Sequence, residues 1–401
     1  MIKNKFIMKH FILVFILTIA TILISPLKAD AAVLPPLEED AAANCVFIGM
    51  PVEFDKVSKS EIIKDINALR YEAYEEGLIN NYVPVKWSPS LEKVAQIRAC
   101  EMASYNNKTT HNRPNGKTQW VLIDNGLKSR SESVAWTSWR THANYTINTM
   151  WHAEKKYFTG DLSALHYGAI INPYHTHVGM AVVYSAGGTY IVAELNHFGL
   201  SPENQLNNYG NQTQVVELPK IGVSVSLTGA GTIASGSTSS YSFNTKYNGL
   251  KMVPLRVIWK TSNSKIASIY NGKVTGIAPG KATITGQLAY KQTVYPITAS
   301  KTITVNPKKT SLTKVTGGSK YFKAYWSRQT KNSPSYQIEY SKSSTFAKGN
   351  KKINITKNSV LGKKITKLPK GKYYVRIRTY KKVSDITYYS SWSSKKVVTV
   401  K

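Results

Sequence analysis

Two histidines that lie close together, His175 and His177, are the first residues whose type and spacing could support chemistry. They flank Thr176, so on a β-strand both side chains would project from the same face. Imidazole nitrogens at this spacing could contribute to a secondary metal site, or the two residues could be ordinary surface histidines. The surface interpretation is the one that we favour for this pair.

The local motifs of several common enzyme classes do not occur in the chain. The sequence has no Gly-x-Ser-x-Gly, no His-Glu-x-x-His and no Cys-x-x-Cys, so a serine hydrolase, a zincin or a thiol redox enzyme has no local support. The segment from Gly276 to Lys281 is one residue short of a phosphate-binding loop, and Ala282 replaces the Ser or Thr that would bind magnesium. This segment therefore predicts a β-turn.

Helical and strand periodicities in the first half of the chain predict the elements that would position any site. Apolar residues recur with helical spacing after Ser58, where Ser60 is a candidate N-cap and Gly77 a stop signal. The expected elements are helices at residues 58–77, 90–105 and about 144–158, and hairpin strands at 178–184 and 189–195. Helices mixed with a late antiparallel sheet indicate an α+β fold for residues 58–200.

Charge is distributed very unevenly along the chain. The 401 residues include 53 Lys and Arg against 22 Asp and Glu, a net charge of +31. Residues 1–220 contain 20 basic and 20 acidic side chains, residues 221–306 contain 9 and none, and residues 307–401 contain 24 and 2. A surface with so few carboxylates cannot neutralise itself, so the C-terminal part of the chain favours a polyanion as its partner.

The N-terminal residues have the three parts of a secretory signal peptide. Basic residues precede an uncharged stretch at residues 11–24, and Ala29, Asp30 and Ala31 form a cleavage site of the Ala-x-Ala type. The uncharged stretch is shorter than the ~20 apolar residues of a membrane span. We therefore expect cleavage after Ala31, a secreted, extracellular or cell-wall location, and no transmembrane anchor. The expected division is a signal peptide at 1–31, a leader or linker at 32–57, an α+β domain at 58–200, a linker at 201–220, and β-modules at 221–306 and 307–401.

The chain has two cysteines, Cys45 and Cys100. An exported protein reaches a compartment in which disulfides persist. One bridge between them and two free, buried thiols both fit the sequence.

The two C-terminal modules have short alternating strands and no helical periodicity. Gly and Asn turns separate the strands, which is typical of small β-sandwiches. In the second module, Tyr373, Val375 and Ile377 are expected to face inward, and Arg376 and Arg378 outward.

Seven segments of the N-terminal half share their order and spacing with a known family. They are residues 67–70, 85–91, 111–116, 131–136, 151–154, 166–167 and 178–181. Together they resemble the CAP superfamily, also called the SCP domain, in the form of its secreted bacterial members. The resemblance implies an α-β-α sandwich with a broad cleft, followed here by two all-β sandwiches.

The same resemblance implies that a tetrad of two histidines and two glutamates lines the cleft. The set consists of His111, Glu132, Glu154 and His166. Such a cluster could bind a divalent metal, zinc before others, with all four residues as ligands, or it could only brace the cleft through hydrogen bonds. In a catalytic version Glu132 or Glu154 would be the base, and His111 and His166 would hold the cation.

The two β-modules have resemblances of their own. Residues 221–306 resemble a bacterial Ig-like domain of group 2, and residues 307–401 resemble a fibronectin type III module. The segments that carry these resemblances are 259–267, 272–276 and 278–283 in the first module, and Trp326, 336–340, 368–373 and 391–393 in the second.

Two functions fit these features. In the first, the His/Glu cleft binds a metal or a protein, glycan or lipid ligand, while the basic modules attach the protein to anionic cell-envelope polymers such as teichoic acid. In the second, the protein is a metal-assisted extracellular hydrolase acting on peptide, glycan or ester bonds. A structural surface protein with a vestigial cleft is a third interpretation. Nucleic acid is a less favoured partner, because an exported protein meets anionic wall polymers first.

Overall fold

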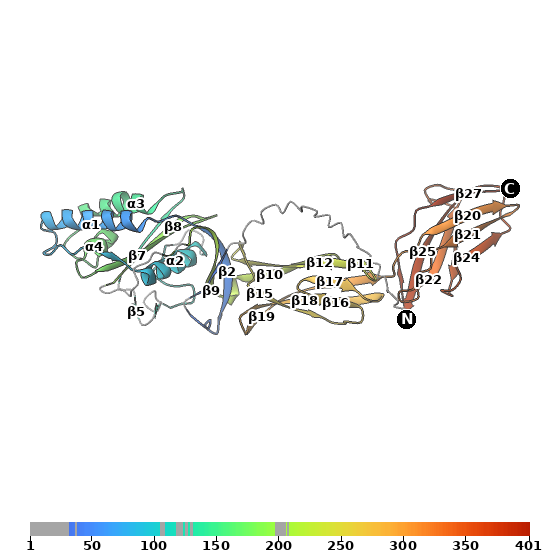
Figure 1. Cartoon of the computed structure of the whole chain (residues 1–401), viewed down its shortest axis with the longest axis horizontal. Helices are drawn as coiled ribbons and strands as arrows, with labels where there is room; N and C mark the ends of the chain where they lie inside the picture. The colour runs from blue at the N-terminus through green and yellow to red at the C-terminus, as the bar shows by residue number, and fades with distance from the viewer. Residues whose placement is uncertain are drawn as a thin grey trace, which may run out of the picture.

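Figure 1 shows an α+β domain at the N-terminal end of the chain and two all-β modules after it. The computed structural model describes residues 32–36, 38–104, 109–117, 123–124, 127–128, 131–196, 206 and 208–401. The expected signal peptide at residues 1–31 lies outside the described residues. None of the helices in the described part of the chain is long and apolar enough to cross a membrane.

A seven-stranded sheet forms the centre of the N-terminal domain. Its strands are β1 (Val33–Leu34), β2 (Cys45–Phe54), β3 (Lys86–Trp87), β6 (Ser131–Thr137), β7 (His177–Ser185), β8 (Gly188–Asn196) and β9 (Gly210–Pro219), while β4 (Ile123–Asp124) and β5 (Leu127–Lys128) pair separately. The order across the sheet is β1-β9-β2-β7-β8-β6, and β3 pairs with β7. The long strands β7 and β8 pair in antiparallel register, which confirms the expected hairpin.

Helices cover both faces of this sheet. They are α1 (Lys59–Glu75), α2 (Pro89–Ser104), α3 (Ala143–Tyr145), the π-helical η2 (Thr146–Trp151), the 3-10 helix η3 (His152–Tyr157) and α4 (Leu165–Ile171). Met180 of β7 belongs to the apolar core that includes α1 and α4, whereas the next residue, Ala181, belongs to the core beneath α2. This alternation is the two-residue period of a strand buried on both faces. A Cβ on Gly179 would lie 1.9 Å from the backbone nitrogen of Glu92, so glycine is required where α2 crosses β7.

The sheet extends beyond the expected domain limits of residues 58 and 200. Strand β2 lies in the segment expected to be a leader, and β9 lies in the segment expected to be a linker. The two strands pair continuously from Cys45 opposite Pro219 to Phe54 opposite Gly210. Both are largely buried, so β2 lacks the polar-apolar alternation by which a half-exposed strand is recognised.

Local signals at the helix ends are partly as expected. Helix α1 begins at Lys59 with Ser58 as its N-cap, not Ser60, because the Ser58 hydroxyl accepts a hydrogen bond from the Glu61 backbone nitrogen. Gly77 has a φ of +70°, which favours glycine and ends the helical segment. The third helical stretch is divided among α3, η2 and η3.

The two cysteines are free thiols and both are buried. Burial raises the pKa of Cys45 to about 11, and it raises the pKa of Cys100 well above its ordinary value. Neither side chain is therefore a reactive thiolate at neutral pH.

The middle module consists of β-strands and shares apolar packing with the N-terminal domain. Its elements are η4 (Lys220–Gly222), β10 (Val223–Thr228), β11 (Thr232–Ala234), β12 (Thr238–Ser240), β13 (Ser242–Tyr247), β14 (Leu250–Met252), β15 (Arg256–Thr261), β16 (Ala267–Tyr270), β17 (Lys273–Gly276), β18 (Gly280–Tyr290) and β19 (Thr293–Asn306). Gly49 of β2 exchanges two backbone hydrogen bonds with Val253, at 3.0 and 2.8 Å. The Phe47 backbone nitrogen donates to the Tyr295 hydroxyl at 3.2 Å. Strand β2 is thus hydrogen-bonded both to the N-terminal sheet and to the middle module.

The C-terminal module is a second all-β unit. Its strands are β20 (Leu312–Gly318), β21 (Tyr321–Trp326), β22 (Ser335–Ser341), β23 (Lys351–Ile355), β24 (Gly362–Thr366), β25 (Gly371–Val383), β26 (Ile386–Tyr389) and β27 (Lys396–Val400). As expected for β25, Tyr373, Val375 and Ile377 are buried in the core, whereas Arg376 and Arg378 lie on the other face and are only partly buried.

Candidate functional site

The four predicted site residues form two separate His–Glu pairs. The first pair joins His111, in the loop at residues 109–117, to Glu132 near the start of β6. Nδ1 of His111 lies 2.8 Å from Oε1 of Glu132. The His111 side chain is 52% exposed, but that of Glu132 is 0% exposed. This pair therefore presents its imidazole to solvent and keeps its carboxylate buried.

Glu132 is held as a carboxylate by its neighbours. Nε of Arg98, from α2, donates to Oε2 of Glu132 at 2.7 Å. Burial opposes ionisation of Glu132, but the hydrogen bonds from His111 and Arg98, the Arg98 charge and a hydrogen bond with Glu194 together lower its pKa. An ionised and enclosed carboxylate can orient His111, but it is poorly placed to exchange protons with a substrate.

The second pair joins Glu154, in η3, to His166 in the first turn of α4. Nδ1 of His166 lies 2.7 Å from Oε1 of Glu154. The other carboxylate oxygen accepts hydrogen bonds from the backbone nitrogens of His166, at 2.7 Å, and Tyr167, at 3.1 Å. Glu154, in the preceding helix η3, therefore caps α4 and orients the imidazole at the same time. The Trp151 ring stacks on His166 with a centroid separation of 5.7 Å.

A cavity of about 240 Å³ lies beside the second pair. Its lining residues are Thr109, Val134, Ala135, Trp136, Met150, Trp151, Glu154 and His166. The Glu154 and His166 side chains are 24% and 31% exposed, so both are accessible from this cavity. The first pair is absent from the lining, although Thr109 is close in sequence to His111.

The arrangement limits how a metal ion could be held. In the described part of the chain, no three His, Cys, Asp or Glu residues are grouped so that they could hold one ion. A closed four-ligand zinc site made of the predicted tetrad is therefore not assembled. Each imidazole instead uses Nδ1 toward a carboxylate, which is the usual way of orienting a histidine whose Nε2 binds a metal. The described residues therefore form no preassembled metal site, and His111 and His166 are only candidate donors, each oriented by its glutamate.

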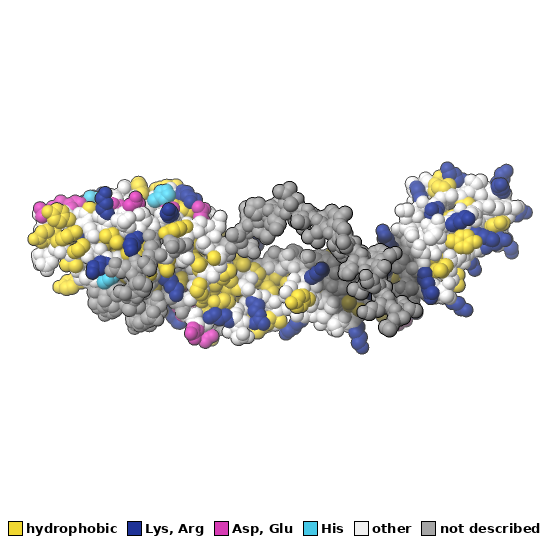
Figure 2. Space-filling view, in the orientation of Figure 1, with side chains coloured by type: hydrophobic (Ala, Val, Ile, Leu, Met, Phe, Trp, Pro, Cys, Tyr) yellow, Lys and Arg dark blue, Asp and Glu magenta, His cyan; other side chains and the backbone are white. Residues whose placement is uncertain are grey.

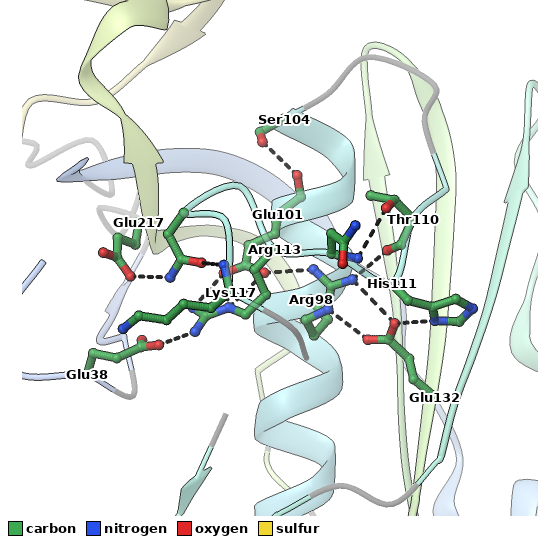
Figure 3. A network of polar contacts seen from close by, with 12 residues as sticks. Glu38, Arg98, Glu101, Ser104, Thr110, His111, Arg113, Lys117, Glu132 and Glu217 are labelled. Carbon is green, nitrogen blue, oxygen red and sulfur yellow. Dashed lines mark hydrogen bonds and ion pairs between the residues drawn. The ribbon is translucent and has the colours of Figure 1, made fainter. Parts of the chain in front are cut away.

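A buried ionic network behind the first pair is a feature that the sequence did not reveal. Arg98 and Glu101 of α2 have fully buried side chains, and Arg113 is 1% exposed. Glu101 accepts from Nη1 of Arg98 at 2.8 Å and from Nη2 of Arg113 at 2.7 Å, so it lies between the two guanidinium groups (Figure 3). Burial lowers the pKa of Arg98, but the Glu101 and Glu132 charges outweigh this and raise it. The only sequence signal for this network was that Arg98 and Glu101, two charged residues three apart, lie on the apolar side of the helix.

The network fixes the loop that carries His111. Nη2 of Arg98 donates to the Thr110 carbonyl at 2.6 Å, next to His111 in sequence. In the same loop, Arg113 pairs with Glu38 of the N-terminal arm that precedes β2, and Nδ2 of Asn115 donates to Glu217 of β9 at 2.6 Å. These contacts connect α2, the loop, the arm and β9, so the position of His111 depends on four separate segments (Figure 3).

The histidine pair at His175 and His177 does not form a shared strand face. Strand β7 begins at His177, and His175 precedes it. His175 is 9% exposed, and its Nδ1 lies 3.1 Å from the Ala169 carbonyl. Its backbone carbonyl also accepts a hydrogen bond from Nη1 of Arg70 at 2.8 Å. The expectation of an ordinary surface histidine is therefore wrong for His175, which is part of the packing between α1 and α4.

Comparison with known proteins identifies the N-terminal domain. The model of the cysteine-rich secretory protein family, CAP, matches residues 64–198, which include all four predicted site residues. No curated protein matches the chain.

Solved structures that are similar to the chain are fibronectin type III proteins. The human fibronectin type III domain containing protein 3 domain is 21% identical, with 23% of this chain and 81% of that chain covered and a TM-score of 0.18. The chicken CNTN1 FN1–FN3 domains are 13% identical over 54% and 83%, with a TM-score of 0.21, and a chicken tenascin two-domain segment is 14% identical over 43% and 97%, with a TM-score of 0.29. Residues 64–198 are therefore a domain of the CAP family.

Proposed function

We propose that this chain is a secreted binding protein whose CAP domain presents a ligand cleft and whose two β-modules hold an anionic polymer of the cell envelope. The observation that carries the proposal is the separation of charge along the chain. Residues 1–220 are electrically balanced, whereas residues 221–401 have 33 basic and 2 acidic side chains. Figure 2 shows acidic side chains gathered on the N-terminal domain and basic side chains spread over the C-terminal module.

The two acidic residues of the C-terminal module do little to neutralise it. Glu339 is 2% exposed and accepts a hydrogen bond from Nε of Arg376 at 2.6 Å. Asp385 is fully exposed, and its nearest cationic partner is Nζ of Lys382 at 3.6 Å. The remaining lysines therefore keep their charge available to a polyanion, and counterion release would favour its binding.

The aromatic residues of the C-terminal module favour a wall polymer such as teichoic acid over nucleic acid. Sequence-independent binding of single-stranded nucleic acid uses exposed rings on which the bases stack. In the fully described C-terminal module, Tyr325 is the one exposed aromatic side chain, at 40%, whereas Trp326 and Tyr336 are buried in the core. The guanidinium carbons of Arg376 and Arg378 lie 4.6 and 4.3 Å from the centroid of the Trp392 ring. These two cations already contact this ring.

The CAP cleft would hold a ligand beside Glu154 and His166. The ligand could be a protein, glycan or lipid group, and a divalent ion, with zinc preferred, would be held through the two imidazoles. A bound zinc ion would polarise a ligand carbonyl or activate a water molecule. This supports a second candidate function, a metal-assisted extracellular hydrolase acting on peptide, glycan or ester bonds. Glu154 is the better placed base for it, because it is partly exposed and lines the cavity, whereas Glu132 is enclosed.

Binding of the anionic polymer is tested by calorimetry on the full chain. The ligands are polyglycerol phosphate and single-stranded DNA with the same number of phosphates, at one salt concentration. We expect tighter binding of polyglycerol phosphate. Equal or tighter binding of DNA would contradict selection of a wall polymer, and binding of neither would overturn the proposal.

Two matched variants locate the binding surface. The first removes four exposed lysines of the C-terminal module, and the second removes four exposed lysines of the CAP domain. The substitutions to Gln are at Lys314, Lys357, Lys363 and Lys396 in the first, and at Lys56, Lys64, Lys86 and Lys156 in the second. Affinity for polyglycerol phosphate should fall about tenfold or more in the first variant and change less than about twofold in the second. Equal losses would contradict the assignment to the β-modules.

Metal binding by the CAP domain is tested by zinc titration of the full chain. Wild type should bind one zinc ion, and the double variant His111→Ala with His166→Ala should bind none. The matched control replaces His142 and His152, which pair with Asp55 and Glu72 outside the cavity. Retention of zinc binding by the His111/His166 variant would remove the metal from the cleft and leave the tetrad as a bracing cluster.

A further inference from the structure

We propose that a cavity at the free end of the C-terminal module binds a phosphorylated sugar or polyol unit. The inference rests on the proposed polymer binding and assigns it a specific subsite. The cavity has a volume of about 730 Å³, within the range of small-ligand sites. It lies between the connection from β22 to β23 and the turn before β25. Its lining residues are Tyr340, Ser341, Lys342, Ser343, Ser344, Lys348, Gly349, Lys351, Leu368, Pro369 and Tyr373.

The cavity is at the end of the module that faces away from the rest of the chain. In the register of β25, Gly371 pairs with Val400 beside the C-terminus. The opposite end of β25 is near the middle module, because the Thr379 hydroxyl donates to the Lys308 carbonyl. The free end in Figure 1 is therefore the end that bears the cavity, and it is open to a long polymer.

Aromatic and apolar side chains form the floor of the cavity. The Tyr340 and Tyr373 rings are separated by 6.2 Å, and Tyr340 also packs edge-on against Phe322 at 5.4 Å. The Tyr373 hydroxyl donates to the Pro369 carbonyl at 2.9 Å, which fixes this ring. Tyr340 and Tyr373 are 7% and 5% exposed, and Nζ of Lys342 lies 5.5 Å from the Tyr373 centroid, so the floor offers a small, rigid apolar area to a sugar or polyol beside a cation.

Positive charge surrounds this floor. Lys342, Lys348 and Lys351 line the cavity, and no Asp or Glu does. Nζ of Lys342 donates to the Lys370 carbonyl at 3.2 Å and so connects the two loops. In the fully described C-terminal module, the ammonium groups of Lys348 and Lys351 make no hydrogen bond or ion pair. They are available to bind a phosphate group.

The module's carboxylates do not compete for these lysines. Glu339 precedes Tyr340 on β22, so its side chain lies on the opposite face of the sheet, where Arg376 binds it. Asp385 is in the turn between β25 and β26, toward the opposite end of the module. The cavity therefore combines an apolar floor with an uncompensated cationic rim, which selects an anionic ligand that also has an apolar face.

The loop at residues 342–350 is held in shape without a ligand. The Ser341 hydroxyl donates to the Lys348 carbonyl at 2.8 Å, and Nδ2 of Asn350 donates to the Phe346 carbonyl at 2.6 Å. The Phe346 ring lies 4.0 Å from the Arg376 guanidinium. Because these contacts order the loop beforehand, binding would cost little conformational entropy.

The test is calorimetry of the full chain with glucose 1-phosphate, methyl glucoside and inorganic phosphate as probes. We expect saturable binding of glucose 1-phosphate and much weaker binding of the other two, because each lacks one half of the recognised group. Equal affinity for inorganic phosphate and glucose 1-phosphate would overturn the proposal, since charge alone would then explain the binding. Absence of glucose 1-phosphate binding would also overturn it.

Matched double variants then locate the site. Lys348→Ala with Lys351→Ala should weaken glucose 1-phosphate binding about tenfold or more, because both cationic donors to the phosphate are lost. Lys314→Ala with Lys357→Ala removes the same charge from exposed positions outside the cavity and should change the affinity less than about twofold. Equal losses in the two variants would contradict the site.

The outcome for the polymer separates this inference from the proposed function. If Lys348→Ala with Lys351→Ala binds polyglycerol phosphate as well as wild type, while the variant lacking Lys314, Lys357, Lys363 and Lys396 loses affinity, the cavity is not the subsite and polymer binding by the β-modules still stands. If wild type does not bind the polymer at low salt, the proposed function fails whatever the result with glucose 1-phosphate.

Discussion

The CAP domain and the C-terminal module use charged side chains in opposite ways. In the CAP domain, Arg98, Glu101 and Glu132 are fully buried and bonded to one another. In the C-terminal module most lysines are exposed, and the buried Glu339 is the exception. Buried pairs are sensitive to the loss of a partner and fix geometry, whereas exposed charges affect stability little and act at a distance through their field. Buried charge therefore positions His111 in one region, and exposed charge in the other is the basis of our proposal that it recruits an anionic partner.

The largest expected effect comes from breaking the buried network. Glu101→Gln keeps the shape of the side chain but leaves the Arg98 and Arg113 guanidinium groups without their shared carboxylate. We expect a loss of about 3–5 kcal/mol in the free energy of unfolding, measured by urea denaturation of the full chain. The matched control is Glu53→Gln, which breaks the exposed pair with Arg140 and should cost less than about 1 kcal/mol. A similar loss for both variants would contradict the difference between buried and exposed pairs.

A second effect concerns pH and another buried carboxyl group of α2. Glu92 is 2% exposed, and burial raises its pKa from 4.5 to about 7 despite hydrogen bonds from the Leu206 backbone and the Trp87 indole. The folded chain therefore binds this proton more tightly than the unfolded chain, so ionisation of Glu92 destabilises the fold as the pH rises from about 4.5 to about 7.

Replacement of Glu92 by Gln removes this pH-dependent penalty. Relative to wild type, Glu92→Gln should gain about 3 kcal/mol of stability between pH 4.5 and pH 8, because a shift of one pKa unit corresponds to roughly 1.4 kcal/mol. The measurement is urea denaturation at both pH values. A difference between variant and wild type that does not change with pH would contradict the raised pKa.

A smaller effect should follow from removing the ring that contacts two arginines of the C-terminal module. Trp392 stacks with Arg376 and Arg378, and Arg378 also lies 3.7 Å from the centroid of the Tyr389 ring. Here cations pack on aromatic faces, where the CAP domain uses carboxylates. Trp392→Ala should reduce the free energy of unfolding by about 2 kcal/mol, compared with less than about 0.5 kcal/mol for the control Tyr270→Ala at an exposed position. Equal costs would show that the stack contributes nothing.

Sequence periodicity predicted the fold best where an element is long and locally defined. Helix α1 and the hairpin of β7 and β8 have regular apolar patterns and terminal glycines, and both are confirmed. Helix α4 was not predicted, because it has seven residues and its Ala164 N-cap makes no side-chain hydrogen bond. The backbone nitrogens of its first turn instead donate hydrogen bonds to the carboxylate of Glu154, which lies outside the helix. Interactions of this kind depend on the tertiary fold and leave no local pattern.

The full extent of the central sheet was not predictable for a related reason. Strand β9 follows a segment rich in Asn, Gln and Gly that is typical of a linker, and its partner β2 lies more than 150 residues earlier. Pairing between such distant strands has no signal in a local window. The four site residues were likewise expected only from the family resemblance, and as one tetrad, not as two pairs. The supporting Arg98 and Glu101 were missed because charged residues on a helix are usually exposed.

The most direct test of the central claim is the salt dependence of polyglycerol phosphate binding by the full chain. The association constant should fall linearly with salt on a double-logarithmic plot, with a slope that reports the number of phosphates neutralised. We predict a steep slope that becomes shallower in the variant lacking Lys314, Lys357, Lys363 and Lys396, and an unchanged slope in the variant lacking the four CAP-domain lysines. A salt-independent association constant, or equal changes of slope in the two variants, would contradict the account.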